Sequence, residues 1–517
     1  MTDRIVTEFR KLRDINTPII LIEDFDYARI DEIISAGLAN SDAAIREWNP
    51  ATGITNFENK EGRIESLDNF LAEIYQDEYK KERFIVLKDI GAFVDNPRVN
   101  SFLQLIAQRK LYDYKGWNTT IVIVSPSIKL PEEILKYSSY LDIPFPDDVE
   151  IDLQIDEHLE VNDYKDEFRE EDKPSIRESL KGLSRFDIDR VLDMAMSDGG
   201  TLSAKDNDMI LKQKKAMVKK SGLVEYVDTK LSLEDIGGLD HLKEYLNDKK
   251  KIITNLSKAK SYGVKTPKGI FIVGMPGCGK SLCAKAVSTT FGIPLLKMDM
   301  GSMMQKYVGE SESNLRNAIK LAEATAPCVL WIDEIEKAFS GTGGHNDILT
   351  RMFGYFLSWM QEKTSSVYVV ATANSADNLP PELKRKGRFD EIFCVNLPKE
   401  KERKAIFDVH YNKIRSGREK KYEEINFTKA ASDTYTEGFN GADIEAVINE
   451  TVERCFVKNI NFSEKEVLDT VKATTSISRS CATQIAAMES MFKESCFKDA
   501  TTGDLTNQKE DKQKKQK

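Results

Sequence analysis

The stretch GIFIVGMPGCGKSLCAKAVSTTF, residues 269–291, decides the fold of the second half of the chain. Its first five residues predict a buried strand, the pattern G-x-x-x-x-G-K-S follows from Gly274 to Ser281, and the remainder suits a helix. Glycines let the backbone curl so that N–H groups and a helix N-terminus face an anion. This context predicts a site for the phosphates of a nucleoside triphosphate.

The loop supplies most of the candidate nucleotide contacts. They are Gly274, Pro276, Gly277, Cys278, Gly279, Lys280, Ser281 and Leu282. Lys280 adds a point charge, and the Ser281 hydroxyl is a candidate Mg²⁺ ligand. Cys278 leaves two interpretations open, because Lys280 and the helix N-terminus favour a reactive thiolate, whereas a neutral thiol merely fills space.

A second motif follows about fifty residues later. The run CVLWIDE, residues 328–334, predicts a buried strand that ends in two acids at the edge where a phosphate site would lie. Two acids after a strand can simply form a solvated loop. Together with the glycine loop, they instead predict that Asp333 holds Mg²⁺ and that Glu334 orients and polarises the attacking water.

Composition limits the class of protein. The 517 residues allow roughly three packing units. Lys plus Arg (75) and Asp plus Glu (85) give a net charge of −10, and the mean hydropathy is −0.43. No apolar run reaches the ~20 residues that cross a bilayer, and no signal core opens the chain. We therefore expect no membrane segment, and global charge disfavours nucleic acid binding.

The second half alternates strands with helix-length segments. Its strand candidates are 269–274, 294–300, 328–333, 367–374 and 392–397. The alternation predicts an α/β fold with a doubly wound parallel sheet, followed by a helical lid. The first half has strand candidates at 18–23, 84–87 and 119–124.

Three segments of the first half match the second half in the same order. FIVLKDI (84–90) aligns with VLWIDEI (329–335), LPEEI (130–134) with LPPEL (379–383), and LSRFDIDRVL (183–192) with FNGADIEAVI (439–448). We interpret the halves as two copies of one plan, each with its own lid. The alternative is that the alternating sequence pattern of strands and helices recurs in any α/β protein, so that the matches need no duplication.

These patterns predict five segments. They are an N-terminal domain without a phosphate loop (1–198), a Lys-rich linker (199–231), a core (232–412), a helical lid (413–500) and a disordered tail (501–517).

From about Leu231 to Arg454 the sequence resembles an AAA-family ATPase module, a P-loop NTPase. Ile236–Leu239 resembles the segment that wraps adenine, which makes Gly237 a nucleotide contact. Asn374 resembles sensor 1. Leu383–Asp390 resembles the second region of homology, and the resemblance implies that Arg385 and Arg388 reach the γ-phosphate of a neighbouring subunit. It therefore implies ATP, Mg²⁺ and a ring of identical subunits, such as a hexamer.

The segment Lys306–Glu310 resembles the pore loop of AAA translocases, in which Tyr307 would grip a protein client. A second axial loop is placed at 341–345. The opposing interpretation is that Tyr307 packs locally and that the protein is a slow, nucleotide-gated scaffold recruiting partners through its N-terminal domain.

The N-terminal copy departs from this chemistry. Lys88-Asp89 stands where Asp333-Glu334 does, and a lysine at that position repels a metal ion. We expect this copy not to hydrolyse ATP. Together with this degenerate copy, the junction KKSGLVEYVDTKLSLEDIGGLD (219–240) and the helix segment FLSWMQEK (356–363) most resemble the uncharacterised AAA proteins of cyanobacteria and algal plastids, the hypothetical plastid reading-frame family. The resemblance covers nearly the whole chain and implies a bacterial cytoplasm or a plastid stroma.

Overall fold

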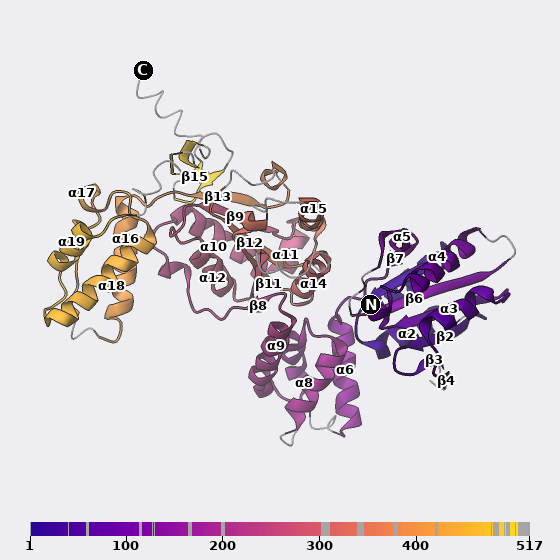
Figure 1. The fold of residues 1–517 in the computed structure, drawn as a ribbon. Coiled ribbons are helices and arrows are strands. Elements are labelled where there is room, and N and C mark those ends of the chain that lie inside the picture. Colours follow the sequence, from indigo (N-terminus) through magenta and orange to yellow (C-terminus); the bar gives the residue numbers. More distant parts are fainter. Residues whose placement is uncertain are drawn as a thin grey trace. The chain divides into compact units, whose positions relative to one another are not determined.

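The computed structural model describes most of the chain, in two compact units. The described residues are 2–39, 41–57, 62–112, 116–126, 128, 130–163, 168–197, 202–300, 311–338, 346–375, 381–385, 387–418, 422–476, 478, 485–486, 488–490, 492, 497–501 and 503–504. The units are Met1–Lys214 and Lys215–Lys517 (Figure 1). Each is described below by itself.

The first unit is an α/β layer followed by helices. Its elements are α1 (Thr2–Asp14), β1 (Ile19–Glu23), α2 (Tyr27–Leu38), β2 (Ala44–Asn49), β3 (Gly53–Asn56), β4 (Gly62–Arg63), α3 (Leu67–Gln76), β5 (Glu82–Lys88), α4 (Pro97–Tyr112), β6 (Asn118–Ser125), α5 (Glu132–Leu135), β7 (Ser138–Tyr140), α6 (Asp148–Val161), α7 (Lys173–Leu180) and α8 (Arg185–Met196). Helix α9 (Asn207–Ser221) lies in the predicted linker and spans the boundary of the units.

Helices cover both faces of this sheet. Ile19 and Leu21 of β1 pack with α3 and α4, whereas Ile20 and Ile22 pack with α1 and α2. Because successive strand residues point to opposite faces, a strand covered on both sides needs apolar residues throughout. This requirement explains the unbroken apolar run that begins at Ile19.

The second unit repeats the plan and adds a lid. Its elements are β8 (Glu225–Tyr226), α10 (Asp240–Thr254), α11 (Leu256–Ser261), β9 (Gly269–Gly274), α12 (Lys280–Phe291), β10 (Leu295–Asp299), α14 (Ser311–Ala324), β11 (Cys328–Asp333), α15 (Asn346–Glu362), β12 (Val367–Ala373), β13 (Glu391–Val395), α16 (Glu400–Arg415), α17 (Asp433–Thr436), α18 (Gly441–Lys458), α19 (Glu464–Ala473), β14 (Lys498–Asp499) and β15 (Gly503–Asp504). The lid helices α16–α19, orange to yellow in Figure 1, pack around Phe407 and Phe427.

The two sheets share one strand order. The second unit has β15-β14-β13-β9-β12-β11-β10-β8, in which β13, β9, β12, β11 and β10 are parallel. The first unit has β4-β3-β2-β5-β6-β1-β7, in which β7, β1, β6, β5 and β2 are parallel. Counted along the chain, both parallel blocks run fifth, first, fourth, third, second. The predicted AAA-like N-terminal copy is therefore confirmed at the level of topology.

The end of the described chain differs from the prediction of a lid followed by a tail. After the lid, β14 pairs in parallel with β13, and β15 pairs with β14. The prediction of a structureless tail from residue 501 is wrong for Thr501 and for Gly503–Asp504. Backbone pairing places these residues at an open sheet edge. The lid also begins earlier than predicted, with α16 at Glu400.

Candidate nucleotide-binding site

The glycine loop joins β9 to α12. Gly277 and Gly279 have φ angles of 78° and 85°, in the left-handed region that glycine adopts without strain. Gly279 is the residue that caps α12, whose first turn begins at Lys280. The first N–H groups of a helix have no partner within the helix, and the helix dipole favours negative charge there. The loop can therefore cradle a phosphate chain.

Lys280 is held by its own loop. Its side chain is buried, and Nζ donates hydrogen bonds to the carbonyl oxygens of Gly274 (2.6 Å) and Met275 (2.8 Å). Burial lowers the pKa of the ammonium group, while the nearby acids oppose the shift. The site thus carries a buried cation that a phosphate oxygen can neutralise better than two carbonyl groups can.

The two acids lie at the end of β11. Thr372 of the neighbouring strand β12 donates from Oγ1 to Asp333 Oδ1 (2.7 Å) and accepts the backbone N–H of Glu334 (3.2 Å). Glu334 has a φ of 50°, which turns its side chain away from the strand direction. Thr372 thus holds the Asp333 carboxylate and the Glu334 backbone at one edge of the sheet.

Glu334 is poised as an ionised carboxylate. It forms an ion pair with Lys337 and accepts a hydrogen bond from Asn374 Nδ2 (2.8 Å). The Lys337 hydrogen bond is the largest cause that lowers the pKa of Glu334, and Asn374 adds to it. Such a carboxylate can accept a hydrogen bond from a water molecule at neutral pH.

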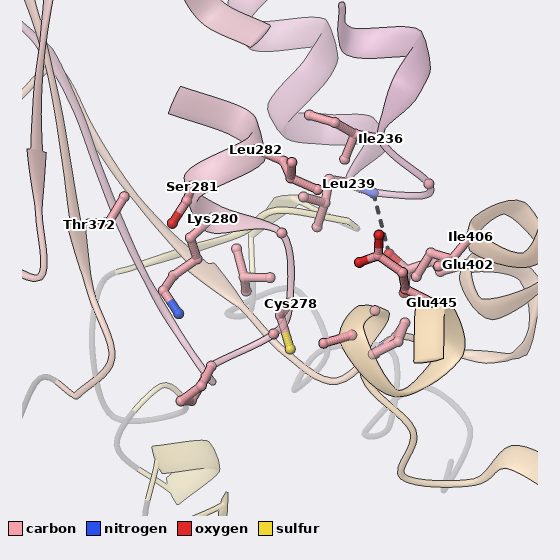
Figure 2. A pocket seen from close by; sticks show the side chains of 18 of the residues that line it. Ile236, Leu239, Cys278, Lys280, Ser281, Leu282, Thr372, Glu402, Ile406 and Glu445 are labelled. Carbon is pink, nitrogen blue, oxygen red and sulfur yellow. Dashed lines mark hydrogen bonds between the residues drawn. The ribbon is translucent and has the colours of Figure 1, made fainter. Parts of the chain in front are cut away.

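These groups share one cavity of about 460 Å³ with the lid (Figure 2). In Figure 2, Lys280, Ser281 and Thr372 lie on one side, and Glu402, Ile406 and Glu445 of the lid lie on the other. The predicted residues that line it are Gly237, Pro276, Gly277, Cys278, Gly279, Lys280, Ser281, Leu282, Asp333, Glu334 and Asn374. The structure therefore brings together residues that lie far apart along the second unit.

Four of the predicted site residues are not among the described residues that line the cavity: Gly274, Arg385, Arg388 and Tyr307. Gly274 contributes only its carbonyl group, to Lys280. Arg385 is exposed, and Arg388 donates to the carbonyl oxygen of Glu382; neither is among the described residues that line the cavity. Tyr307, with the two predicted axial loops, lies outside the described residues.

Cys278 is a neutral thiol in this site. Its side chain is buried against the cavity, and burial raises its pKa to about 11, although Lys280 pulls the other way. The structure therefore favours the interpretation as a neutral thiol, because desolvation outweighs the neighbouring charge.

Several lining residues were missed by the sequence analysis. Thr372 precedes Asn374 by two positions, and a polar residue inside a buried strand was the available signal. Glu402 and His410 of α16 and Glu445 of α18 carry no motif. Asn440 reaches the loop, where Nδ2 donates to the carbonyl oxygen of Pro276 (3.1 Å).

The corresponding edge of the first unit is filled by its own side chains. Lys88, at the end of β5, pairs with Asp31 (2.9 Å) and Glu47 (3.0 Å). Asp89 has a φ of 53°, like Glu334, and accepts a hydrogen bond from the Tyr27 hydroxyl. An ammonium group thus lies at the position where the second unit has its candidate metal-binding carboxylate.

The loop before α2 is also different. Only three residues, 24–26, separate β1 from α2, against five between β9 and α12. The Asp26 carboxylate caps α2 by accepting the backbone N–H of Arg29 (3.1 Å). A side-chain carboxylate thus satisfies the helix terminus that would otherwise attract a phosphate.

The strand order, the glycine loop and the paired acids define a P-loop NTPase of the AAA class. Residues 270–397 match the family described as "ATPase family associated with various cellular activities (AAA)". Residues 5–143 and 149–221 match the N-terminal and second domains of SpoVK-like AAA ATPases.

Relatives extend over the whole chain. The "Uncharacterized AAA domain-containing protein ycf46" of Guillardia theta is 32% identical, covering 94% of this chain and 94% of its own. That of Trieres chinensis is 33% identical, covering 87% and 89%. The chain belongs to this ycf46 family of AAA proteins. An "ATP-dependent zinc metalloprotease FtsH" of Aster yellows witches'-broom phytoplasma is 32% identical over 46% of this chain and 35% of its own.

Within the described part of the chain, no helix is long and apolar enough to span a bilayer.

Proposed function

We propose that the protein binds ATP with Mg²⁺ in the cavity of its second unit and hydrolyses the bond between the β- and γ-phosphates. The observation that carries this proposal is the convergence of Lys280, Asp333, Glu334 and Asn374 on one cavity with the glycine loop. Family membership supports it, because the AAA match covers the same residues.

The chain's own residues would divide the work. The α12 N-terminus and Lys280 bind and neutralise the phosphate oxygens, and Asn374 keeps Glu334 directed into the cavity. Glu334 then accepts a hydrogen bond from the attacking water and orients it, since phosphoryl transfer depends on positioning and charge. Thr372 holds Asp333 in place.

The residues present fit a magnesium ion. Ser281 and Asp333 both line the cavity and offer the hard oxygen ligands that Mg²⁺ prefers. Bound there together with the nucleotide, the ion would neutralise charge on the phosphates.

We further propose that the protein works as a ring of identical subunits, in which Arg385 and Arg388 of one subunit complete the site of the next. Both arginines lie apart from the cavity of their own chain, so they are available to a neighbour. From the resemblance to ring-forming translocases, we propose a protein client, engaged by Tyr307, and a bacterial cytoplasm or plastid stroma as the compartment.

For the first unit we propose a role that does not use nucleotide. Its five-strand order matches the ATPase unit, but Lys88 and Asp26 fill the positions of metal and phosphate. This arrangement favours a partner-recruiting or client-receiving domain.

A Lys280→Ala protein should test nucleotide binding directly. Removing a buried charge-assisted hydrogen bond worth about 1.5–3 kcal/mol should weaken ATP about 10- to 100-fold. Isothermal titration with ATP and Mg²⁺ measures the change. Lys251→Ala, which removes an exposed lysine outside the cavity, is the matched control and should bind as the wild-type protein does. Unchanged affinity in Lys280→Ala would contradict the proposal.

A further inference from the structure

The segment after the lid returns to the sheet and contacts residues that line the nucleotide cavity. We call residues 497–501 and 503–504 the return segment. Its strand β14 places Lys498 beside Phe393 and Asp499 beside Cys394 of β13. The Ala500 N–H donates to the carbonyl oxygen of Cys394 (3.0 Å). The return segment is thereby fixed along the edge of the ATPase sheet.

The return segment also contacts the start of α10. We call residues 236–239, which precede this helix and are predicted to contact adenine, the adenine loop. The Leu242 N–H donates to the carbonyl oxygen of Ala500 (2.9 Å), and His241 Nδ1 lies 3.2 Å from the carbonyl oxygen of Asp499. Residues separated by more than two hundred positions thus share hydrogen bonds at the first turn of α10.

Two buried carboxylates connect the return segment to cavity-lining residues. The first is Asp499, which is 5% exposed. Its Oδ2 accepts a hydrogen bond from Asn396 Nδ2 (3.1 Å), and its Oδ1 accepts the Thr501 N–H (2.7 Å). Asn396 lines the cavity between β13 and α16.

The second carboxylate is Glu402, which is 8% exposed and lines the cavity. Its Oε1 accepts hydrogen bonds from the Thr501 hydroxyl (2.6 Å) and from the Leu239 N–H (3.4 Å), the latter drawn in Figure 2. Its Oε2 accepts the Lys399 N–H (3.0 Å) at the start of α16. One side chain therefore joins the return segment, the adenine loop and the lid.

The adenine loop needs such support. Leu239 has a φ of 58°, a left-handed conformation that is strained for a residue with a side chain. A Cβ on Gly238 would come within 2.7 Å of Glu402 Oε1, so the loop is packed tightly on this carboxylate. A strained backbone persists where its surroundings hold it, and Glu402 accepts the Leu239 N–H at that point.

Leu239 and Glu402 line the part of the cavity that lies across from the phosphate loop. Ile236, Leu239 and Ile406 are among the apolar lining residues there, and Figure 2 shows them apart from Lys280 and Ser281. A triphosphate bound by the glycine loop would place its nucleoside against this apolar end.

We propose that Thr501 and Asp499 are positioning residues for the nucleoside end of the site. This inference rests on the proposed ATP binding. Thr501 fixes the Glu402 carboxylate, and Glu402 fixes Leu239, so the shape that meets the base depends on a hydroxyl group of the return segment. Asp499 likewise fixes the side chain of Asn396, which lines the cavity.

The test compares ATP with inorganic tripolyphosphate, which has the phosphates but no nucleoside. In Thr501→Val, affinity for ATP should fall about tenfold, as expected for losing a hydrogen bond to a charged group, while affinity for tripolyphosphate stays unchanged. Thr501→Ser keeps the hydroxyl and should restore ATP affinity. Isothermal titration of the full chain with each ligand and Mg²⁺ gives both constants.

Thr428→Val is the matched control, because the Thr428 hydroxyl bonds only to exposed Asn426 among the contacts the structure gives it. Three results would each overturn the inference while leaving ATP binding by the wild-type protein intact. Thr501→Val could lose affinity equally for ATP and tripolyphosphate, it could keep its full affinity for ATP, or Thr501→Ser could fail to restore ATP affinity. A wild-type protein that binds tripolyphosphate no more weakly than ATP would also overturn it. Absence of ATP binding by the wild-type protein would overturn the proposed function itself.

Discussion

A Glu334→Gln protein should bind ATP as tightly as the wild-type protein and hydrolyse it at least about a hundredfold more slowly. Gln keeps the size of Glu334 and can still contact Asn374, but it has no negative charge with which to polarise water. The expected loss is therefore in kcat, while the phosphate contacts of the loop and Lys280 remain. Steady-state phosphate release and equilibrium nucleotide binding separate the two effects.

The control for this variant is Glu244→Gln, a matched change at an exposed position of α10. It should leave both kcat and ATP affinity as they are. Turnover by Glu334→Gln equal to that of the wild-type protein would refute the role given to this carboxylate. A parallel loss of ATP binding would mean that Glu334 supports the pocket and does not act on water.

Mixing two inactive proteins should restore activity if sites are shared between subunits. Arg388→Ala should lose about 10³–10⁵ in turnover, the value of an arginine that stabilises transition-state charge in trans. Lys280→Ala should bind ATP about 10- to 100-fold more weakly and should therefore hydrolyse little ATP at concentrations that saturate only the intact loop. In a mixed ring, an intact loop on one subunit can meet an intact Arg388 on its neighbour.

Random assembly at equal amounts should make about a quarter of the sites complete. A site has an intact Lys280 in about half of the cases, and its neighbour has an intact Arg388 in about half of the cases. Phosphate release should therefore rise well above the sum of the two separate proteins as they are mixed. A rate that stays at that sum for every ratio would argue against shared sites. The corresponding mixture with Arg385→Ala tests the second arginine in the same way.

The residues that local motifs predict are those that one loop or one strand end supplies. The glycine loop lies between a strand and a helix in the sequence as in the fold, so Gly277, Lys280 and Ser281 could be placed without knowledge of topology. Asp333 and Glu334 were predicted for the same reason. Glu402 and Thr501 could not be found in this way, because their partners lie 163 and 99 residues away along the chain.

The fold was predictable to a similar depth. Strands covered on both faces have long apolar runs, and these runs predicted β1, β5, β6, β9, β11 and β12. Strands of two residues, such as β14 and β15, show no periodicity, and they form by pairing: β14 with the open edge of β13, and β15 with β14. The interpretation of two copies of one plan rested on three matched segments, and the strand order of the two sheets supports it independently.

The two units show how one strand order can keep or lose a ligand site. The second unit leaves the α12 terminus open and holds Lys280 by carbonyl groups that a phosphate can replace. The first unit caps α2 with Asp26 and pairs Lys88 with two acids. A charge satisfied by fixed side chains gains little from an added ligand.

Titration of the wild-type protein with ATP and Mg²⁺, with chain concentration known independently, tests the central claim most directly. We expect saturation at one nucleotide per chain, because one unit offers an open phosphate loop and the other fills the equivalent positions with its own side chains. Absence of saturable binding, or two nucleotides per chain, would contradict this account.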